Sequence, residues 1–356
     1  MRKKYIDNIR WITVVLVVIY HVFYVFNGVG VQGGVGSFCM PQYQDLILYI
    51  LYPWFMLLLF VISGMSARFC LETCTHKEFV RKKTVKLLVP STVGLFVFWW
   101  IAGYFNMKAG GAFENMGYVP KPVLYLIMCM SGTGPLWYIQ LLWVFSVLLI
   151  AFRKVEKDRL WNVCKKTNVP ELVLMVLLIW GAAQIGNVPV VTVYRFGIYG
   201  AGYFIGYLVF SHDEVMDRLE KMWLPLGICS AVSGVIFTAV FWGKSYVEHD
   251  VLDTLLCNLF AWTTVLSVLS FMKKYGNFEN KFTCFMKRES WGLYLFHYLP
   301  LLVCALYIYK SAMPAALKYA LTALSAFFGS MLLYEIISRI PVLRRLVCGI
   351  ERKNKK

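Results

Sequence analysis

The sequence predicts an all-α integral membrane protein, a polytopic bundle of about ten transmembrane helices with both termini in the cytoplasm. Hydrophobic residues make up 59% of the 356-residue chain and charged residues only 15%, against roughly 25% in a soluble domain. The mean hydropathy is +0.62, and the cations fall in alternate loops. This composition excludes a disordered chain, a collagen-like fibre and a disulfide-rich secreted module, and it argues against an ordinary soluble enzyme.

Long apolar runs define the predicted helices. A hydrocarbon core of roughly 30 Å requires about 20 mostly apolar residues per helix. Ten such runs are predicted: 9–28, 46–67, 87–105, 134–152, 171–187, 194–210, 223–243, 251–272, 290–309 and 314–339. We interpret the first run as a retained span, because the apolar region of a signal peptide would be shorter. The sixth run contains glycines that predict close helix packing: Gly197, Gly200, Gly202 and Gly206.

The loop charges assign each helix end to one side of the membrane. Basic loops stay on the cytoplasmic side, and acidic residues count for little in this rule. Cations gather at the N-terminus, after the second, fourth and eighth runs, and in the tail, whereas residues 29–45 contain none. We expect residues 1–345 to form one membrane domain and residues 346–356 a short basic cytoplasmic tail. The net charge of +17 follows from this topology, so nucleic-acid binding is not expected.

The first run carries ionisable residues where lipid penalises them by at least ~2.5 kcal/mol each. Asp7 and Arg10 are three residues apart and can form an ion pair near the inner surface. His21 follows Arg10 by eleven residues, which returns it to nearly the same helix face roughly 16 Å deeper. An imidazole there can take a proton from a hydroxyl near neutral pH. The same residues also fit a buried histidine bonded to a carbonyl and an arginine that only flanks the span.

Two further stretches place polar side chains at the ends of spans. Trp137 and Tyr138 follow a Gly/Pro break, where such residues are typical of the membrane interface, while Gln140 lies deeper and should face the bundle. Tyr294 and His297 are three residues apart in the ninth run. A second intramembrane histidine strengthens the prediction of a polar cavity.

The remaining charged residues allow more than one interpretation. A cationic cluster precedes the third run and fits either phosphate binding or topology alone: Arg81, Lys82, Lys83 and Lys86. Arg195 begins the sixth run, where it can contact a polar acceptor or snorkel. Glu335 and Arg339 are spaced to pair with each other. A loose cluster in one loop lacks an evident fourth ligand, so no metal site is expected: Cys70, Cys74 and His76.

These stretches together resemble the acyltransferase 3 family of integral membrane acyltransferases. The resemblance covers nearly the whole chain, and the family's ten-helix layout agrees with the predicted spans. Five ordered motifs carry it: Asp-x-x-Arg and Arg-x10-His at Asp7, Arg10 and His21; Phe-x-x-Ser-Gly at Phe60, Ser63 and Gly64; the basic motif before the third run; Leu-Trp-Tyr at Leu136, Trp137 and Tyr138; and Tyr-x-x-His at Tyr294 and His297.

The resemblance implies a reaction and roles for its residues. An acyl group, acetyl or succinyl, would pass from cytoplasmic acyl-CoA to a hydroxyl of an extracytoplasmic glycan, lipid head group or envelope polymer, across a bacterial cytoplasmic membrane. His21 would be the catalytic base or acyl relay, and Arg10 would contact the CoA phosphates or help to hold the acyl donor. The family's Arg-x-x-Arg motif maps to Lys83 and Lys86, and lysine lacks the bidentate fork of arginine. Supporting or site-lining positions would be Asp7, Trp137, Tyr138, Gln140, Tyr294 and His297.

The resemblance also sets expectations about partners, and other classes stay open. No tightly bound cofactor or metal is expected, and the chain would be the stand-alone form without a fused extracytoplasmic hydrolase-like domain. The main alternative is a multi-span transporter or flippase for a polar envelope precursor, although no inverted repeat stands out. A sensory or scaffold membrane protein is a third option. The sequence does not indicate an oligomeric state.

Overall fold

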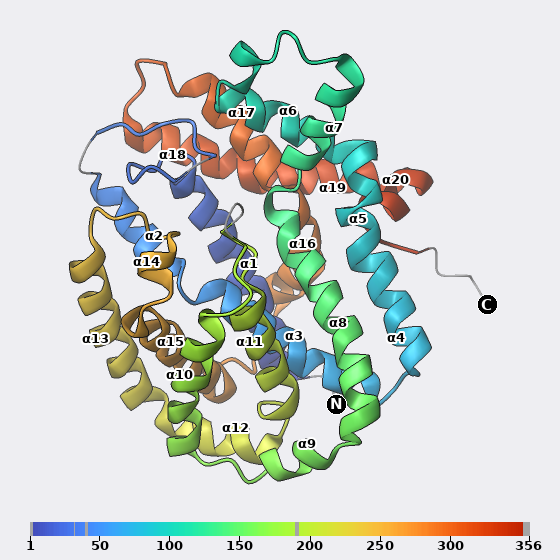
Figure 1. The fold of residues 1–356 in the computed structure, drawn as a ribbon, viewed down its shortest axis with the longest axis vertical. Helices are drawn as coiled ribbons and strands as arrows, with labels where there is room; N and C mark the ends of the chain where they lie inside the picture. The colour runs from blue at the N-terminus through green and yellow to red at the C-terminus, as the bar shows by residue number, and fades with distance from the viewer. Residues whose placement is uncertain (1–2, 32, 40–41, 189–191, 352–356) are drawn as a thin grey trace. The chain divides into compact units, whose positions relative to one another are not determined.

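Every regular element of the protein is a helix (Figure 1). The computed structural model describes residues 3–31, 33–39, 42–188 and 192–351. Within these ranges there is no β-strand, only an isolated antiparallel bridge between Asn187 and Arg195. A helix satisfies its backbone hydrogen bonds internally, as a chain in lipid must. The predicted all-α class is therefore confirmed.

The α-helices vary widely in length. In chain order they are α1 (Lys4–Tyr24), α2 (Leu46–Leu51), α3 (Phe55–Leu71), α4 (His76–Lys83), α5 (Val89–Ser91), α6 (Trp100–Ala109), α7 (Lys121–Ser131), α8 (Trp137–Glu156), α9 (Arg159–Cys164), α10 (Val169–Ala183), α11 (Phe196–Leu208), α12 (Asp213–Leu219), α13 (Trp223–Phe241), α14 (His249–Leu252), α15 (Leu255–Tyr275), α16 (Lys281–Phe296), α17 (Tyr298–Ile308), α18 (Ala315–Leu324), α19 (Ser330–Arg339) and α20 (Pro341–Leu346).

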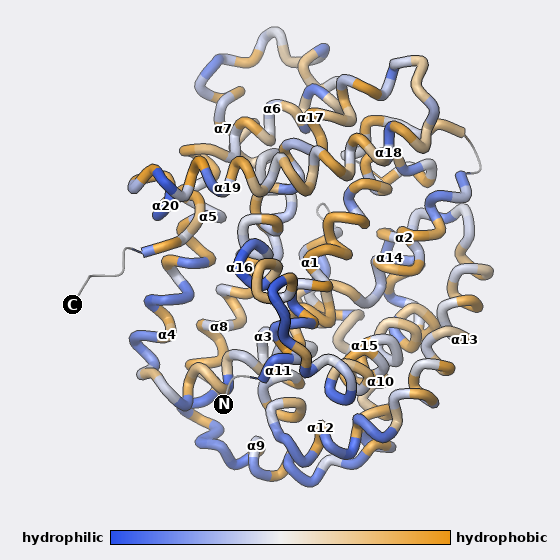
Figure 2. The backbone as a smooth tube through the Cα atoms, turned by 180° about the vertical axis from the view of Figure 1, so that it is seen from behind, coloured by the Kyte–Doolittle hydropathy of each residue, from blue (hydrophilic) through white to orange (hydrophobic). Residues whose placement is uncertain are grey.

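Several of these helices join into stretches that can cross a membrane, and their residues are largely hydrophobic (Figure 2). Within the described part of the chain, seven stretches are long and apolar enough: Lys4–Tyr24, Tyr43–Leu71, His76–Ala109, Gly134–Glu156, Asp213–Phe241, Leu255–Tyr275 and Ala315–Arg339. The pair α16 and α17, bent by 56°, can form an eighth. The chain is therefore a multi-pass membrane protein.

Two predicted spans coincide with helices that are short for a bilayer. The fifth and sixth apolar runs form α10 and α11, which have 15 and 13 residues, whereas a perpendicular span needs about 20. The start of α10 is well defined, because Asn168 and Glu171 form a capping box. The total of ten spans and the cytoplasmic location of both termini stay predictions.

The fold divides into two compact units. The first comprises Met1–Leu16, Leu46–Phe79 and Val144–Lys287, and the second comprises Val17–Asp45, Val80–Trp143 and Arg288–Lys356. In the first unit α11 packs on α3, and α15 packs on both α13 and α10. In the second unit α6 packs on α7 and α17 on α18. Helices α1, α4, α8 and α16 each contribute residues to both units.

Close packing of α3 on α11 depends on glycine in both helices. A Cβ added at Gly64 would lie 1.9 Å from the carbonyl oxygen of Tyr203, and one added at Gly206 would lie 2.0 Å from that of Val61. Any side chain there would force the two backbones apart. The prediction of close packing from the glycines of the sixth run is confirmed at Gly206, which meets the backbone of Val61 in α3, while Gly64 of α3 meets the backbone of Tyr203 in α11.

Irregular helix geometry is concentrated in the second unit. Its π-helical segments are η2 (Thr84–Leu88), η3 (Leu95–Trp99) and η7 (Ser325–Gly329), and such segments often occur at functional sites. Pro300 lies in the first turn of α17 and cannot donate a hydrogen bond to the carbonyl of Phe296. The α16–α17 span bends at this point, and His297 sits at the break between the two helices.

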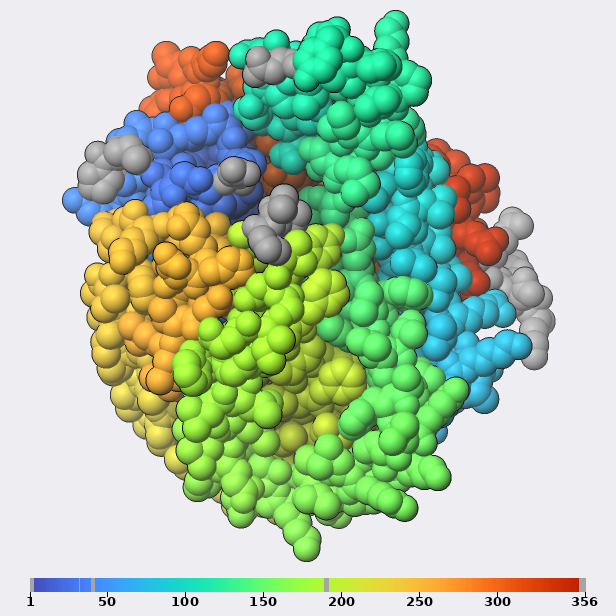
Figure 3. All heavy atoms as spheres, in the orientation of Figure 1, coloured from blue at the N-terminus to red at the C-terminus, as the bar shows by residue number. Residues whose placement is uncertain are grey.

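Residues after α19 pack back onto the same unit. Val347 and Cys348 are completely buried, and the Trp291 indole N–H donates to the carbonyl of Cys348 at 2.9 Å. Figure 3 shows surface residues of the C-terminal region, in red, beside the cyan region that contains α5, and α20 packs on α5. The predicted tail of residues 346–356 thus begins with packed structure, while residues 352–356 lie outside the described residues.

Candidate active site

Two histidines that are 276 residues apart in sequence meet in the second unit. His21 is carried by the last turn of α1, and His297 by the break between α16 and α17. The His297 Nε2 atom lies 3.3 Å from the His21 Nδ1 atom, and the ring centroids are 4.9 Å apart. His297 has 0% exposure, whereas His21 is half-buried. His21 is therefore the more exposed member of the pair.

The backbone around the pair determines which ring nitrogens carry hydrogen. His297 Nδ1 lies 2.8 Å from the carbonyl of Tyr294 and 3.0 Å from that of Leu293, and His21 Nδ1 lies 2.8 Å from the carbonyl of Val17. A carbonyl oxygen only accepts, so both Nδ1 atoms must donate. His297 Nε2 is then an acceptor that shares the His21 Nδ1–H. The lone pair of a neutral His21 consequently lies on Nε2.

Aromatic rings surround this pair. The ring centroid of His21 lies 5.1 Å from that of Tyr20, 5.8 Å from that of Tyr24 and 5.5 Å from that of Tyr298. The Tyr298 hydroxyl donates to Asn106 Oδ1 at 3.3 Å. This bond connects the start of α17, next to His297, to α6. The site therefore combines a polar centre with walls of hydrophobic and phenolic groups.

The predicted aromatic element of α8 is buried in the same unit. Trp137 and Tyr138 are only 9% and 7% exposed, so both rings pack inside the protein; their location at the membrane interface stays a prediction. Tyr138 packs on Tyr294 with ring centroids 5.6 Å apart, and the Tyr294 hydroxyl donates to the carbonyl of Pro135. These rings position the helix that leads to His297.

Gln140 also contacts the rest of the second unit. Its Nε2 donates to the carbonyl of Ser91 at 2.8 Å, in the short helix that follows the first π-helical segment. The expectation that Gln140 faces the bundle is confirmed. Its amide cross-links α8 to α5 where Pro90 interrupts regular helical hydrogen bonding.

The two lysines of the basic motif lie at the start of the same irregular span. Lys83 ends α4 and is half-buried, while Lys86 is exposed on the π-helical segment η2. The Lys86 ammonium lies 4.9 Å from the ring centroid of Trp291, a distance suited to a cation–π interaction. Both lysines thus belong to the second unit, together with the histidine pair.

Arg10 and Asp7 belong to the first unit. Arg10 Nη1 donates to Asp7 Oδ1 at 3.2 Å, which confirms the predicted ion pair, and Nη2 donates to Ser66 Oγ at 2.7 Å. The Arg10 side chain is 39% exposed. Helix α1 is continuous from Lys4 to Tyr24, so the eleven residues from Arg10 to His21 advance roughly 16 Å along its axis.

A buried cluster around Arg68 lies in the first unit. The sequence analysis treats this arginine only as one of the cations that follow the second run. Arg68 is 6% exposed, and its guanidinium forms an ion pair with Asp158 at 2.5 Å and lies 3.8 Å from the ring centroid of Trp161. The other face of Trp161 stacks on His212, with centroids 4.0 Å apart. The predicted run ends at residue 67, whereas α3 continues to Leu71 and includes Arg68.

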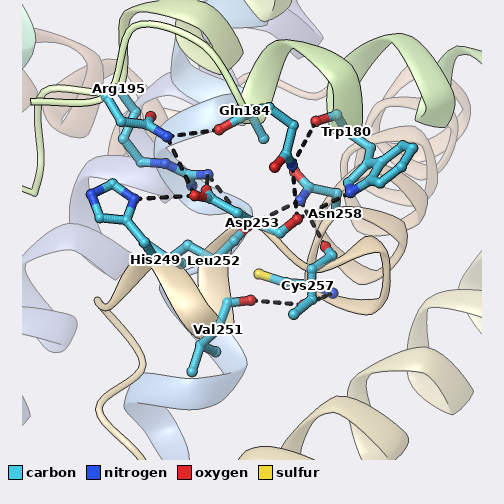
Figure 4. A network of polar contacts seen from close by, with 12 residues as sticks. Trp180, Gln184, Arg195, His249, Val251, Leu252, Asp253, Cys257 and Asn258 are labelled. Carbon is cyan, nitrogen blue, oxygen red and sulfur yellow. Dashed lines mark hydrogen bonds and ion pairs between the residues drawn. The ribbon is translucent and has the colours of Figure 1, made fainter.

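Arg195 lies in another polar network of the first unit (Figure 4). The residue is 4% exposed, and its guanidinium forms an ion pair with Asp253 at 2.9 Å. The backbone carbonyl of Asp253 accepts hydrogen bonds from Trp180 and Gln184, at 3.0 and 2.8 Å, and His249 Nδ1 lies 3.1 Å from its carboxylate. Arg195 therefore does not snorkel. It joins the loop before α11 to the loop before α15.

The loop cluster of cysteines shows no third metal-ligating partner. The Sγ atoms of Cys70 and Cys74 lie 3.6 Å apart, and His76 begins α4. Among the residues that the structure describes, no group of three or more His, Cys, Asp or Glu side chains is placed to hold a metal ion.

A multi-pass helical membrane protein with a histidine pair inside one helical unit is the class defined by this fold and site. The chain belongs to the acyltransferase 3 family, whose acyltransferase domain matches residues 3–335. This membership makes the protein a membrane acyltransferase. No curated protein and no solved structure matches the chain.

Proposed function

We propose that the protein is an acyl-CoA-dependent O-acyltransferase of a bacterial cytoplasmic membrane. It transfers an acetyl or succinyl group to a hydroxyl of an extracytoplasmic glycan, lipid head group or envelope polymer. The observation that carries this proposal is the contact between His21 and His297. This contact supports the His21 tautomer that has its lone pair on Nε2, and His21 is the half-buried member of the pair.

The proposed reaction uses one general base, His21, and the acyl donor itself. His21 Nε2 takes the proton of the acceptor hydroxyl as its oxygen attacks the thioester carbonyl carbon. The resulting tetrahedral intermediate expels the CoA thiolate, the C–S bond breaks, and the thiolate takes the proton back from Nε2. The products are an ester and free CoA-SH. General base catalysis of this kind contributes roughly 10²–10⁴-fold.

His297 is a positioning residue in this scheme. Its Nε2 accepts the His21 Nδ1–H, and this hydrogen bond strengthens when His21 becomes an imidazolium, because bonds to charged donors are stronger. The carbonyl of Val17 shares the same hydrogen. Both acceptors hold the His21 ring with Nε2 directed away from the backbone of α1.

The donor carries phosphate groups that the bilayer excludes, so the proposal requires cations outside the hydrocarbon core. Lys83 and Lys86 are assigned this role within the second unit. Lysine binds phosphate as a point charge and not through a planar fork. Trp291, beside the Lys86 ammonium, keeps that cation near the start of the π-helical segment.

Labelling in reconstituted vesicles tests the reaction. Purified protein receives radiolabelled acetyl-CoA or succinyl-CoA on one side and envelope glycans or lipids on the other. Covalent label on the acceptor, lost in the His21→Ala variant but kept in the Tyr319→Phe variant, is the expected result. Tyr319 is a suitable control because its buried hydroxyl has no hydrogen-bond partner. Normal transfer by His21→Ala would eliminate the mechanism.

One structural feature favours a transporter as the second candidate. The α16–α17 span is bent by 56° at an ionisable residue, and interrupted helices with polar residues are common at transporter binding sites. In the same vesicles, a transporter would accumulate unmodified substrate in the lumen. Transport without covalent label would therefore replace the acyltransferase proposal.

A further inference from the structure

Two cysteines of the first unit meet where α3 ends. Cys70 lies in the last turn of α3, and Cys74 follows four residues later in the connection to α4. Their Sγ atoms are 3.6 Å apart, a distance at which one thiol donates to the other sulfur. Both residues are half-buried, and both are free thiols. The connection therefore holds two thiols in direct contact.

Hydrogen bonds fix the backbone on either side of Cys74. The Cys70 carbonyl accepts the Thr73 N–H and the Thr73 hydroxyl, both at 3.1 Å. Thr75 and Glu78 begin α4 with reciprocal bonds, in which each backbone N–H donates to the side chain of the other residue. Cys74 lies between these two anchored points, so the fold holds its sulfur near that of Cys70.

The positions of the two sulfurs suit a disulfide. An S–S bond is about 2.05 Å long, so the two Sγ atoms must approach by about 1.5 Å. Rotation of the two side chains, together with a small backbone shift at Cys74, supplies this movement. Cys74 is outside regular helix, so the shift breaks no helical hydrogen bond of α3.

The surroundings of the pair indicate a reversible bond. Glu72, Thr73 and Thr75 are exposed, so the two thiols lie among solvent-accessible residues. The connection belongs to a loop that the sequence predicts to be cytoplasmic. Disulfides in such a compartment are usually transient and respond to the redox state.

The pair also encloses a residue that contacts the buried cation of this unit. Glu72 lies between the two cysteines in sequence, and its Oε1 atom is 3.4 Å from the Nε atom of Arg68. Arg68 is in turn bonded to Asp158. A bridge from Cys70 to Cys74 would close a ring around the turn that carries Glu72, so oxidation would act next to the Arg68 cluster.

We infer that Cys70 and Cys74 are a redox-active dithiol that a small disulfide, such as glutathione disulfide, converts reversibly into an intramolecular disulfide. One cysteine thiolate attacks a sulfur of the reagent, whose S–S bond breaks and releases one glutathione thiolate. The other cysteine thiolate attacks the protein sulfur of the mixed disulfide and releases the second. The two thiol protons of the protein pass to the released glutathiones. The protein is oxidised by two electrons and glutathione disulfide is reduced.

Mass spectrometry of the whole protein in nanodiscs tests this inference without an acyltransferase assay. The protein is equilibrated without oxygen in buffers of reduced and oxidised glutathione, quenched with acid, and treated with N-ethylmaleimide to block free thiols. Trypsin cuts after Arg68 and Lys77, so both cysteines lie in the peptide 69–77, which contains no third cysteine. The expected product is this peptide without a maleimide label and lighter than the dithiol by two hydrogen masses.

The stoichiometry gives a quantitative signature. Bridge formation releases two glutathione thiols, so the ratio of disulfide to dithiol varies inversely with the square of the reduced glutathione concentration. About tenfold dilution of the buffer at a constant ratio of its two forms should therefore raise that protein ratio about tenfold. A mixed disulfide releases only one thiol, so its proportion should not change on dilution.

Single variants and a third cysteine provide the controls. Cys70→Ser and Cys74→Ser each keep one thiol and should yield only the mixed disulfide with glutathione. Cys164 is also half-buried and lies in the separate peptide 160–165, so it reports ordinary thiol exchange in the same digest. Excess dithiothreitol should restore both maleimide labels on the peptide 69–77.

Three results would overturn the inference. The first is a peptide 69–77 that stays fully labelled in every glutathione buffer, or that forms the bridge only with copper and air. The second is a wild-type protein in which glutathione remains on Cys70 or Cys74 in place of the bridge. The third is an oxidised peptide that dithiothreitol does not reduce. None of these results bears on acyl transfer, so the proposed function is tested separately.

Discussion

Truncation of His297 tests the coupling on which the proposed chemistry depends. His297 Nε2 accepts the His21 Nδ1–H at 3.3 Å, and this bond strengthens when His21 holds the proton of the acceptor. A hydrogen bond to a charged group contributes about 1.5–3 kcal/mol. His297→Ala should therefore lower kcat by about 10- to 150-fold with little change in the KM for the donor.

The shared action of the two histidines should be visible in a double-mutant cycle. His21→Ala removes the base itself and should lower kcat by roughly 10²–10⁴-fold. Once that base is gone, the partner of Nδ1 has nothing to position, so the double variant should be no slower than His21→Ala. The measurement is the initial rate of acylation in nanodiscs for wild type, both single variants and the double variant.

Controls separate positioning from folding. His297→Asn offers an amide oxygen as an acceptor and should recover part of the rate, and Tyr319→Phe should leave the rate unchanged. Thermal unfolding in the same nanodiscs shows whether each variant folds. Additive losses in the double variant, or a His297→Ala variant that turns over like wild type, would refute the coupling.

Three further predictions concern stability. Gly206→Ala should destabilise the first unit by about 1–3 kcal/mol or more, because its Cβ would lie 2.0 Å from the Val61 carbonyl. Gly200→Ala is the control, because its Cβ meets only the ring of Phe145, at 3.3 Å. Equal melting temperatures for the two variants would contradict the packing argument. Asp253→Ala leaves the buried guanidinium of Arg195 without its carboxylate and should cost about 3–5 kcal/mol, and a melting temperature within error of wild type would count against the network. Burial lowers the pKa of His212, which stacks on Trp161, below its usual value of 6.5. Its contribution to stability should be complete above that pH and decline as the pH falls through the folded-state pKa. His212→Gln should flatten the melting profile below pH 6.5, and a profile identical to that of wild type would contradict this assignment.

Local features of this protein follow from the sequence because they depend on helix geometry. The predicted apolar runs form helices in the structure. This holds also for the fifth and sixth runs, whose helices α10 and α11 are shorter than a bilayer span. The ion pairs of Asp7 with Arg10 and of Glu335 with Arg339 form as their spacing predicts. A helical turn places such residues side by side whatever surrounds them.

Contacts between distant segments were decided only by the tertiary structure. Both histidines are visible in the sequence as polar residues inside spans, but no periodicity relates residues 276 positions apart. Arg68 and Arg195 look like flanking charges until Asp158 and Asp253 are brought against them. The residues after α19 look like a basic tail until Gly349 seats them on Lys86. Helix packing selects these partners, because burial of a polar group requires an acceptor or donor from whichever segment lies beside it.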